Sequence, residues 1–158
     1  MSLLSIFGCG RAKTPEYPAD RLSARDGTEF TITFFKHASL AISVGGKYIY
    51  VDPVSANADY GALPKADIVL ITGPLTTRVR DRVLAVWNEI PEPKITVAVG
   101  ICPISGGVFR EGYSIEGPIS RYIPVDVNVP GCPPRPQAIL EGVVLARKMW
   151  LKKLGIEE

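Results

Sequence analysis

The chain has 158 residues, of which 46% are hydrophobic and 22% charged, and its formal net charge is +2. This composition is typical of a single globular domain with a hydrophobic core. It excludes the strongly basic surface that nucleic-acid binding needs, and no apolar run reaches the length of a membrane span. The three cysteines are an odd number at wide spacing, which argues against a disulfide framework and favours a reducing compartment.

The first part of the chain predicts antiparallel strands. We expect residues 1–28, which are largely polar and contain prolines, to form a surface lead-in, followed by a hairpin region over 29–65. Within that region two short β-branched runs, 40–44 and 47–51, flank Gly45-Gly46. A glycine pair between two such runs is a strong signal for a two-residue hairpin turn.

From residue 66 onward, apolar runs alternate with helical stripes. The runs predict parallel strands at 66–72, 94–99 and 121–125, and the stripes predict helices at 76–90 and 136–153. Alternation of this kind is typical of an α/β fold with right-handed crossovers. We therefore expect one domain over 1–158, in which the hairpin extends the parallel sheet of the 66–158 region or packs beside it. Trp87 and Trp150 should be buried against opposite or adjacent faces of that sheet.

Two cysteines follow two of the expected strands. Cys102 comes shortly after 94–99, and Cys132 comes after 121–125, each with a proline directly behind it. Because parallel strands end at the same edge of a sheet, and ligands bind at that edge, we expect both thiols to be within reach of a common ligand. Two thiolates suit a soft metal ion or an iron–sulfur cluster. The alternative is two unrelated structural cysteines.

Several segments of the second half, taken in order, carry a resemblance to a known family. They are 66–74, 91–94, 98–102, 106–109, 123–127 and 129–136, and the last of them contains Gly131-Cys132-Pro133-Pro134. With these segments, residues from about 67 to 147 resemble the small, cluster-bearing subunit of energy-converting nickel–iron hydrogenases. The same resemblance extends to the 20 kDa subunit of NADH:quinone oxidoreductase.

This resemblance implies a flavodoxin-like three-layer fold in which Cys102 and Cys132 are ligands of a 4Fe–4S cluster. It implies electron transfer beside a large catalytic subunit in a hydrogenase-like or quinone-reductase-like complex, so the chain would be an oxidoreductase subunit. Such a subunit is cytoplasmic or lies on the cytoplasmic face of a membrane complex, and it meets the membrane only through its partners. The family's other two ligands come from a cysteine pair that this chain lacks, and Cys9 is the one remaining candidate cysteine.

A second resemblance covers residues 28–72. The segments 32–40, Gly45-Gly46-Lys47 and Val51-Asp52-Pro53 resemble the start of a lactonase-like hydrolase of the metallo-β-lactamase fold. That family continues with an H-x-H-x-D-H metal motif, where this chain has 73–77 without a histidine. His37 is the only histidine in the sequence, whereas a zinc hydrolase needs about three protein ligands including histidines, which argues against an active hydrolase.

The two resemblances meet on residues 66–72, and we interpret the chain as a chimera joined there, whether natural, engineered or generated. Three hypotheses for its function follow. The first is an electron-transfer iron–sulfur subunit, in which Arg135 orients the cluster or contacts a carboxylate of the partner. The second is a cluster-free α/β scaffold without catalytic activity. The third is the remnant of a hydrolase. Under any of the three, we expect Asp52 to be a turn residue and His37 to be a hydrogen-bonded polar residue.

Overall fold

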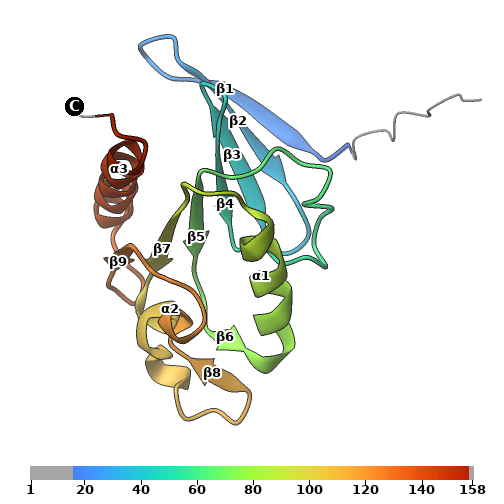
Figure 1. The fold of residues 1–158 in the computed structure, drawn as a ribbon, viewed down its shortest axis with the longest axis vertical. Coiled ribbons are helices and arrows are strands. Elements are labelled where there is room, and N and C mark those ends of the chain that lie inside the picture. The colour runs from blue at the N-terminus through green and yellow to red at the C-terminus, as the bar shows by residue number, and fades with distance from the viewer. Residues whose placement is uncertain (1–15, 157–158) are drawn as a thin grey trace, which may run out of the picture.

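A computed structural model describes residues 16–156, which form one large mixed sheet with helices beside it and a second, two-stranded sheet (Figure 1). The main sheet has the strand order β1-β2-β3-β4-β5-β7-β9. Its strands are β1 (Ala19–Ser23), β2 (Glu29–Phe34), β3 (Leu40–Val44), β4 (Lys47–Val51), β5 (Ile68–Ile71), β7 (Ile95–Val99) and β9 (Val127–Val129). The small sheet pairs β6 (Leu75–Thr76) with β8 (Ile115–Gly117). The helical segments are α1 (Thr77–Glu89), α2 (Ile101–Ser105), η1 (Gly107–Phe109), η2 (Ile119–Arg121) and α3 (Pro136–Lys153).

The first half is an antiparallel meander, β1 to β4. The predicted hairpin at Gly45-Gly46 is confirmed, and it extends the sheet because β4 pairs in parallel with β5. The edge strand β1 lies where we expected only a lead-in. All five of its residues are exposed, so no buried face left a hydrophobic pattern in the sequence.

The second half has the predicted parallel pairing of β5 with β7, and helices α1 and α3 match the expected ones closely. The prediction of a strand at 121–125 is wrong. The strand beside β7 is instead β9, a few residues later, and η2 occupies the start of the expected segment. Pro124 has no N–H to give to a sheet, and the buried Ile123 packs in the hydrophobic cluster on the α1 side. The structure is therefore α/β with a mixed sheet, and the flavodoxin-like layering stays a prediction.

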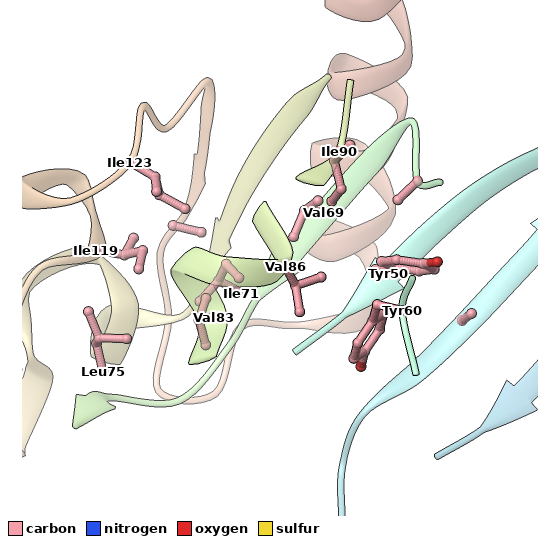
Figure 2. Close-up of a cluster of buried hydrophobic side chains, with 13 residues drawn as sticks. Tyr50, Tyr60, Val69, Ile71, Leu75, Val83, Val86, Ile90, Ile119 and Ile123 are labelled. Atoms are coloured by element: carbon pink, nitrogen blue, oxygen red, sulfur yellow. The ribbon is translucent and has the colours of Figure 1, made fainter. Parts of the chain in front are cut away.

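Strand β5 sends alternate side chains into two separate cores. Val69 and Ile71 pack with α1 and with Tyr50 and Tyr60 in the cluster that Figure 2 shows. Ile68 and Leu70 pack in the other cluster, whose helix is α3. The two helices therefore cover opposite faces of the parallel strands. Trp150 is buried in the α3 cluster as predicted, and Trp87 is half-buried in the α1 cluster.

Two aspartates join neighbouring parallel strands at their amino ends. Asp67, directly before β5, donates its N–H to Tyr48 O and accepts the Tyr48 N–H at its carboxylate at 2.9 Å. Asp126, directly before β9, makes the same pair of bonds with Thr96, at 2.9 and 2.8 Å. The Asp126 carboxylate also pairs with Lys153 Nζ at 3.0 Å, which connects it to the end of α3. Each aspartate thereby extends a parallel ladder by one residue and fixes its register.

The packing of α3 is tested at Trp150, which is 9% exposed and donates its indole N–H to Pro93 O at 3.0 Å. We expect Trp150→Ala to lower the free energy of unfolding by about 3–5 kcal/mol, because a cavity is left. Leu140→Ala on the same helix is the matched control, since Leu140 is 66% exposed. It should change the stability by no more than about 0.5 kcal/mol. Chemical denaturation measures both, and equal midpoints would show that α3 packs on another face.

A second test concerns Gly142, where α3 packs against β9. A Cβ at this position would lie 2.4 Å from Val129 Cγ2. Alanine is better than glycine in a helix by about 1 kcal/mol. At this position we expect alanine to be worse than glycine, so that Gly142→Ala lowers the free energy of unfolding by about 1–3 kcal/mol through overpacking. In a Val129→Ala background the same change should cost less. An identical cost in both backgrounds, measured by denaturation, would exclude the contact with Val129 as the cause.

Candidate functional site

The carboxyl ends of β7 and β9 lie side by side and carry the two candidate cysteines. Cys102 lies in α2, directly after β7, and Cys132 lies in the loop between β9 and α3. The two loops are hydrogen-bonded to each other. Gly100 N–H donates to Val129 O at 2.7 Å, and Ile101 N–H donates to Gly131 O at 2.9 Å. The structure therefore brings both cysteines to one edge of the sheet. Cys102 directly follows the donor of the second hydrogen bond, Ile101, and Cys132 directly follows its acceptor, Gly131.

Glycines permit this close approach of the two loops. Gly100 and Gly131 both have positive φ, and a Cβ on Gly100 would lie 3.4 Å from Gly131 O. A Cβ on Gly131 would lie 2.4 Å from Pro134 Cα, so no larger residue fits there without movement of the backbone. Gly107, in η1, faces Cys102, and a Cβ there would lie 3.3 Å from Cys102 Sγ. Gly107 thus lets the backbone of η1 come close to Cys102, at a position where a side chain would be crowded.

Both thiols are free, and one of the two cysteines is exposed to solvent. Cys132 is exposed and Cys102 is half-buried, and neither forms a disulfide. Within residues 16–156, no group of three or more histidine, cysteine, aspartate or glutamate side chains is placed to hold a metal ion. His37 lies in the β2–β3 turn, so β4 and β5 separate it from the cysteine edge. Cys9 lies outside the described residues. Arg135 is the N-cap of α3, is exposed and lies three residues after Cys132.

An exposed apolar surface follows Cys102 in the chain, and no periodicity in the sequence pointed to it. Val108, Phe109 and Tyr113 are 75%, 52% and 103% exposed, and they lie between α2 and β8. The segment is short of regular structure and rich in glycine, so its apolar residues could not be assigned to a core or a surface in advance. Its position beside α2 makes it part of the cysteine edge.

A polar network ties this segment to α1. The Glu116 carboxylate accepts a hydrogen bond from Tyr122 O–H at 2.6 Å and pairs with Arg80 Nη1 at 3.1 Å. The hydrogen bond from Tyr122, together with that from Thr77 and the nearby Arg80 charge, lowers the pKa of Glu116. The carboxylate is therefore ionised at neutral pH and joins β8, η2 and α1. This network ties the end of the exposed apolar segment at β8 to α1.

The described chain has no helix with the length and hydropathy needed to cross a membrane.

Comparison with known proteins finds relatives among the subunits of respiratory complexes. The probable membrane-bound hydrogenase subunit mbhJ of Pyrococcus furiosus is 51% identical over 94 residues, which are 60% of this chain and 56% of that protein. A subunit of the NADH-quinone oxidoreductase of Rubrobacter xylanophilus is 43% identical over 88 residues, which are 56% of this chain and 35% of that protein. The chain thus spans about half the length, or less, of the curated relatives that it matches.

Among solved structures, one chain of an archaeal respiratory membrane complex, the membrane-bound sulfane sulfur reductase, is similar to this protein. It is 37% identical with a TM-score of 0.52, and the match covers 55% of this chain and 49% of that chain. A protein of Parabacteroides distasonis that is provisionally described as a metal-dependent hydrolase is 36% identical over 52% of this chain and 36% of that chain. Its TM-score is 0.46.

A family model described as NADH ubiquinone oxidoreductase, 20 Kd subunit, matches residues 30–146. The match includes both cysteines, the glycines that bring their loops together and the exposed apolar segment. It also begins well upstream of residues 66–72, where we expected two resemblances to meet, so the chimera stays a prediction. Because the match extends over most of the sequence, the chain belongs to the family of the NADH ubiquinone oxidoreductase 20 Kd subunit.

Proposed function

We propose that this protein is an electron-transfer subunit of a hydrogenase-like or NADH:quinone-oxidoreductase-like complex, and that Cys102 and Cys132 are ligands of a 4Fe–4S cluster. The observation that carries the proposal is the position of the two cysteines on hydrogen-bonded loops at one edge of the sheet. Both thiols are free, and Gly107 lets the backbone of η1 approach Cys102 closely. Membership of the family supports a role in such a complex.

The described residues do not complete the ligand set of such a cluster. A 4Fe–4S cluster takes four cysteine ligands, whereas residues 16–156 supply two cysteines and no group of three suitable side chains. His37 is separated from the cysteine edge by two strands. The missing ligands would therefore come from Cys9 or from a partner chain. The same shortfall favours the second candidate, a cluster-free α/β scaffold.

The surroundings of the cysteines suit a partner subunit. Cys132 is exposed, and Val108, Phe109 and Tyr113 place apolar surface at the same edge of the sheet. Apolar and aromatic side chains of this kind are typical of the centre of a protein interface. We propose that a large catalytic subunit covers this edge and that Arg135 contacts a carboxylate of that subunit. The chain would then lie on the cytoplasmic face of a membrane complex and meet the membrane only through its partners.

Iron binding tests the proposal directly. After anaerobic reconstitution with iron and sulfide, the full chain should contain iron and acid-labile sulfide and should absorb near 400 nm. Cys102→Ser and Cys132→Ser should each abolish the bound iron, because each removes a thiolate ligand. Cys9→Ser should also lower the iron content if Cys9 completes the site.

The control is Ser120→Ala, a change at an exposed residue of η2, which should leave the iron content unchanged. Circular dichroism of every variant establishes that the fold is intact. Iron that survives both cysteine substitutions would show that the ligands lie elsewhere. A folded wild-type chain that takes up no iron, alone or with a hydrogenase-type large subunit, would support the cluster-free scaffold instead.

A further inference from the structure

A second candidate site lies at the other end of the same sheet edge, away from the cysteines. A cavity of about 590 Å³ opens between the β2–β3 turn, the loop after β4 and one face of α1. It lies at the carboxyl ends of β4 and β5, with β7 between it and β9. Its size is that of a site for a small molecule.

The lining of this cavity contains more positively than negatively charged side chains. Lys36 and His37 reach it from the β2–β3 turn, and Arg78 and Arg82 reach it from α1. The two arginines are four residues apart and therefore lie on the same face of the helix. In the described part of the chain, none of the four side chains forms an ion pair with a carboxylate. Three positively charged side chains and one histidine, from two elements, thus line one cavity, and within residues 16–156 none of the four is paired with a carboxylate.

The one carboxylate in the lining, Asp52, is already engaged. Its oxygens accept the Thr72 N–H at 2.6 Å and the Thr72 hydroxyl. Its carboxyl group is largely buried, and this burial raises the pKa of Asp52. The carboxylate therefore holds the junction of β4 with β5 together, and it places one negative charge in a lining that also contains Lys36, Arg78 and Arg82.

The backbone around the cavity is held in an unusual conformation. Among residues 16–156, only His37 and Asp52 are non-glycine residues with positive φ, at 57° and 45°, and both line this cavity. Ser39 fixes the two segments together, since its hydroxyl donates to Asp52 O at 2.6 Å and accepts from Asn57 Nδ2 at 2.7 Å. Sparsely populated backbone conformations tend to occur at ligand sites, where the surrounding contacts maintain them.

Further hydrogen-bond donors lie at and beside the cavity. The first turn of α1 contributes Arg78 and Val79 to the lining, has no acidic residue and receives no side-chain cap from Thr76. The positive end of the helix dipole is thus available to an anion. The adjoining cavity shares Lys36, Ala56 and Asn57 and is lined by Tyr60. The Tyr60 hydroxyl is buried and has no hydrogen-bond partner in the described part of the chain.

We propose that this cavity binds a phosphate group, held by Arg78 and Arg82 on one side and by Lys36 and His37 on the other. Guanidinium groups match the oxygens of a phosphate in a bidentate geometry, and a lysine adds a compact charge. The volume exceeds that of a phosphate ion, so a small phosphate monoester fits as well as inorganic phosphate. The inference is independent of the cysteine edge and of any cluster.

Calorimetric titration of the full chain at low ionic strength tests the site, with inorganic phosphate and glycerol 3-phosphate as separate ligands. We expect saturable binding of at least one of them and a loss of affinity of about tenfold or more in Arg82→Gln and in Arg78→Gln, because each removes a charged hydrogen-bond donor. Tighter binding of glycerol 3-phosphate would identify a phosphate monoester as the ligand class. Equal affinities would identify the free ion.

The matched control is Arg25→Gln. Arg25 lies in the β1–β2 turn, at the opposite end of β2 from Lys36 and His37, and its loss changes the net charge by the same amount. The affinity of the Arg25→Gln variant for phosphate should stay within about twofold of that of the wild type, since a distant exposed charge is screened. Thermal unfolding of each variant verifies the fold. No saturable binding by the wild type, or equal weakening in the control, would overturn the proposal.

Discussion

The structure depends on the burial of both faces of β5. Its residues Ile68–Ile71 are all buried, and alternate ones enter the α1 core and the α3 core. The strand pairs in parallel with β4 on one side and with β7 on the other, so it joins the antiparallel meander to the α/β half. A strand with this environment must be apolar throughout, and a polar residue at any of its positions would lie unpartnered in one of the two cores.

The placement of the functional edge follows from this strand and its neighbours. Asp67 and Asp126 set the register at the amino ends of β5 and β9, and the carboxyl ends are aligned as a result. The cysteine loops leave the sheet at β7 and β9, and the cationic cavity lies at β4 and β5. Two sites of different chemistry therefore share one edge without sharing a residue. One presents free thiols and apolar surface, and the other presents guanidinium and ammonium groups.

Those parts of the fold in which burial determines the residue pattern were predictable from the sequence. Strands β5 and β7 are fully buried, and helices α1 and α3 each bury one stripe, so their apolar runs and periodicities were visible. The position of Cys102 and Cys132 at the same edge of the sheet was predictable from the parallel pairing of the strands that precede them. Strand β9 was placed too early, because Ile123 and Val125 are apolar for packing with the α1 core and not for pairing.

Other features of the structure could not be predicted from the sequence, because they depend on contacts between residues that are far apart in the chain. Strand β1 has no buried face, and its existence depends on pairing with β2. The cationic cavity brings 36–37 together with 78 and 82, and only the fold makes these distant residues neighbours. Asp52 was expected as a turn residue, which describes its position after β4 but not its hydrogen bonds to Thr72 across the junction of the two halves.

The edge strand β1 bears on whether copies of the protein associate with one another in concentrated solution. One side of β1 pairs with β2, and the other side presents the main-chain polar groups of a sheet border, which invite strand addition from a neighbouring molecule. The sequence of this strand opposes such strand addition, because Asp20 and Arg21 place a charge on each face of a fully exposed edge strand. At the far border β9 has only three residues and is followed directly by Pro130. A brief strand ended by a proline is a poor template for fibril growth. Both borders of this seven-stranded sheet are thus protected against self-association, by charge on one side and by brevity and proline on the other.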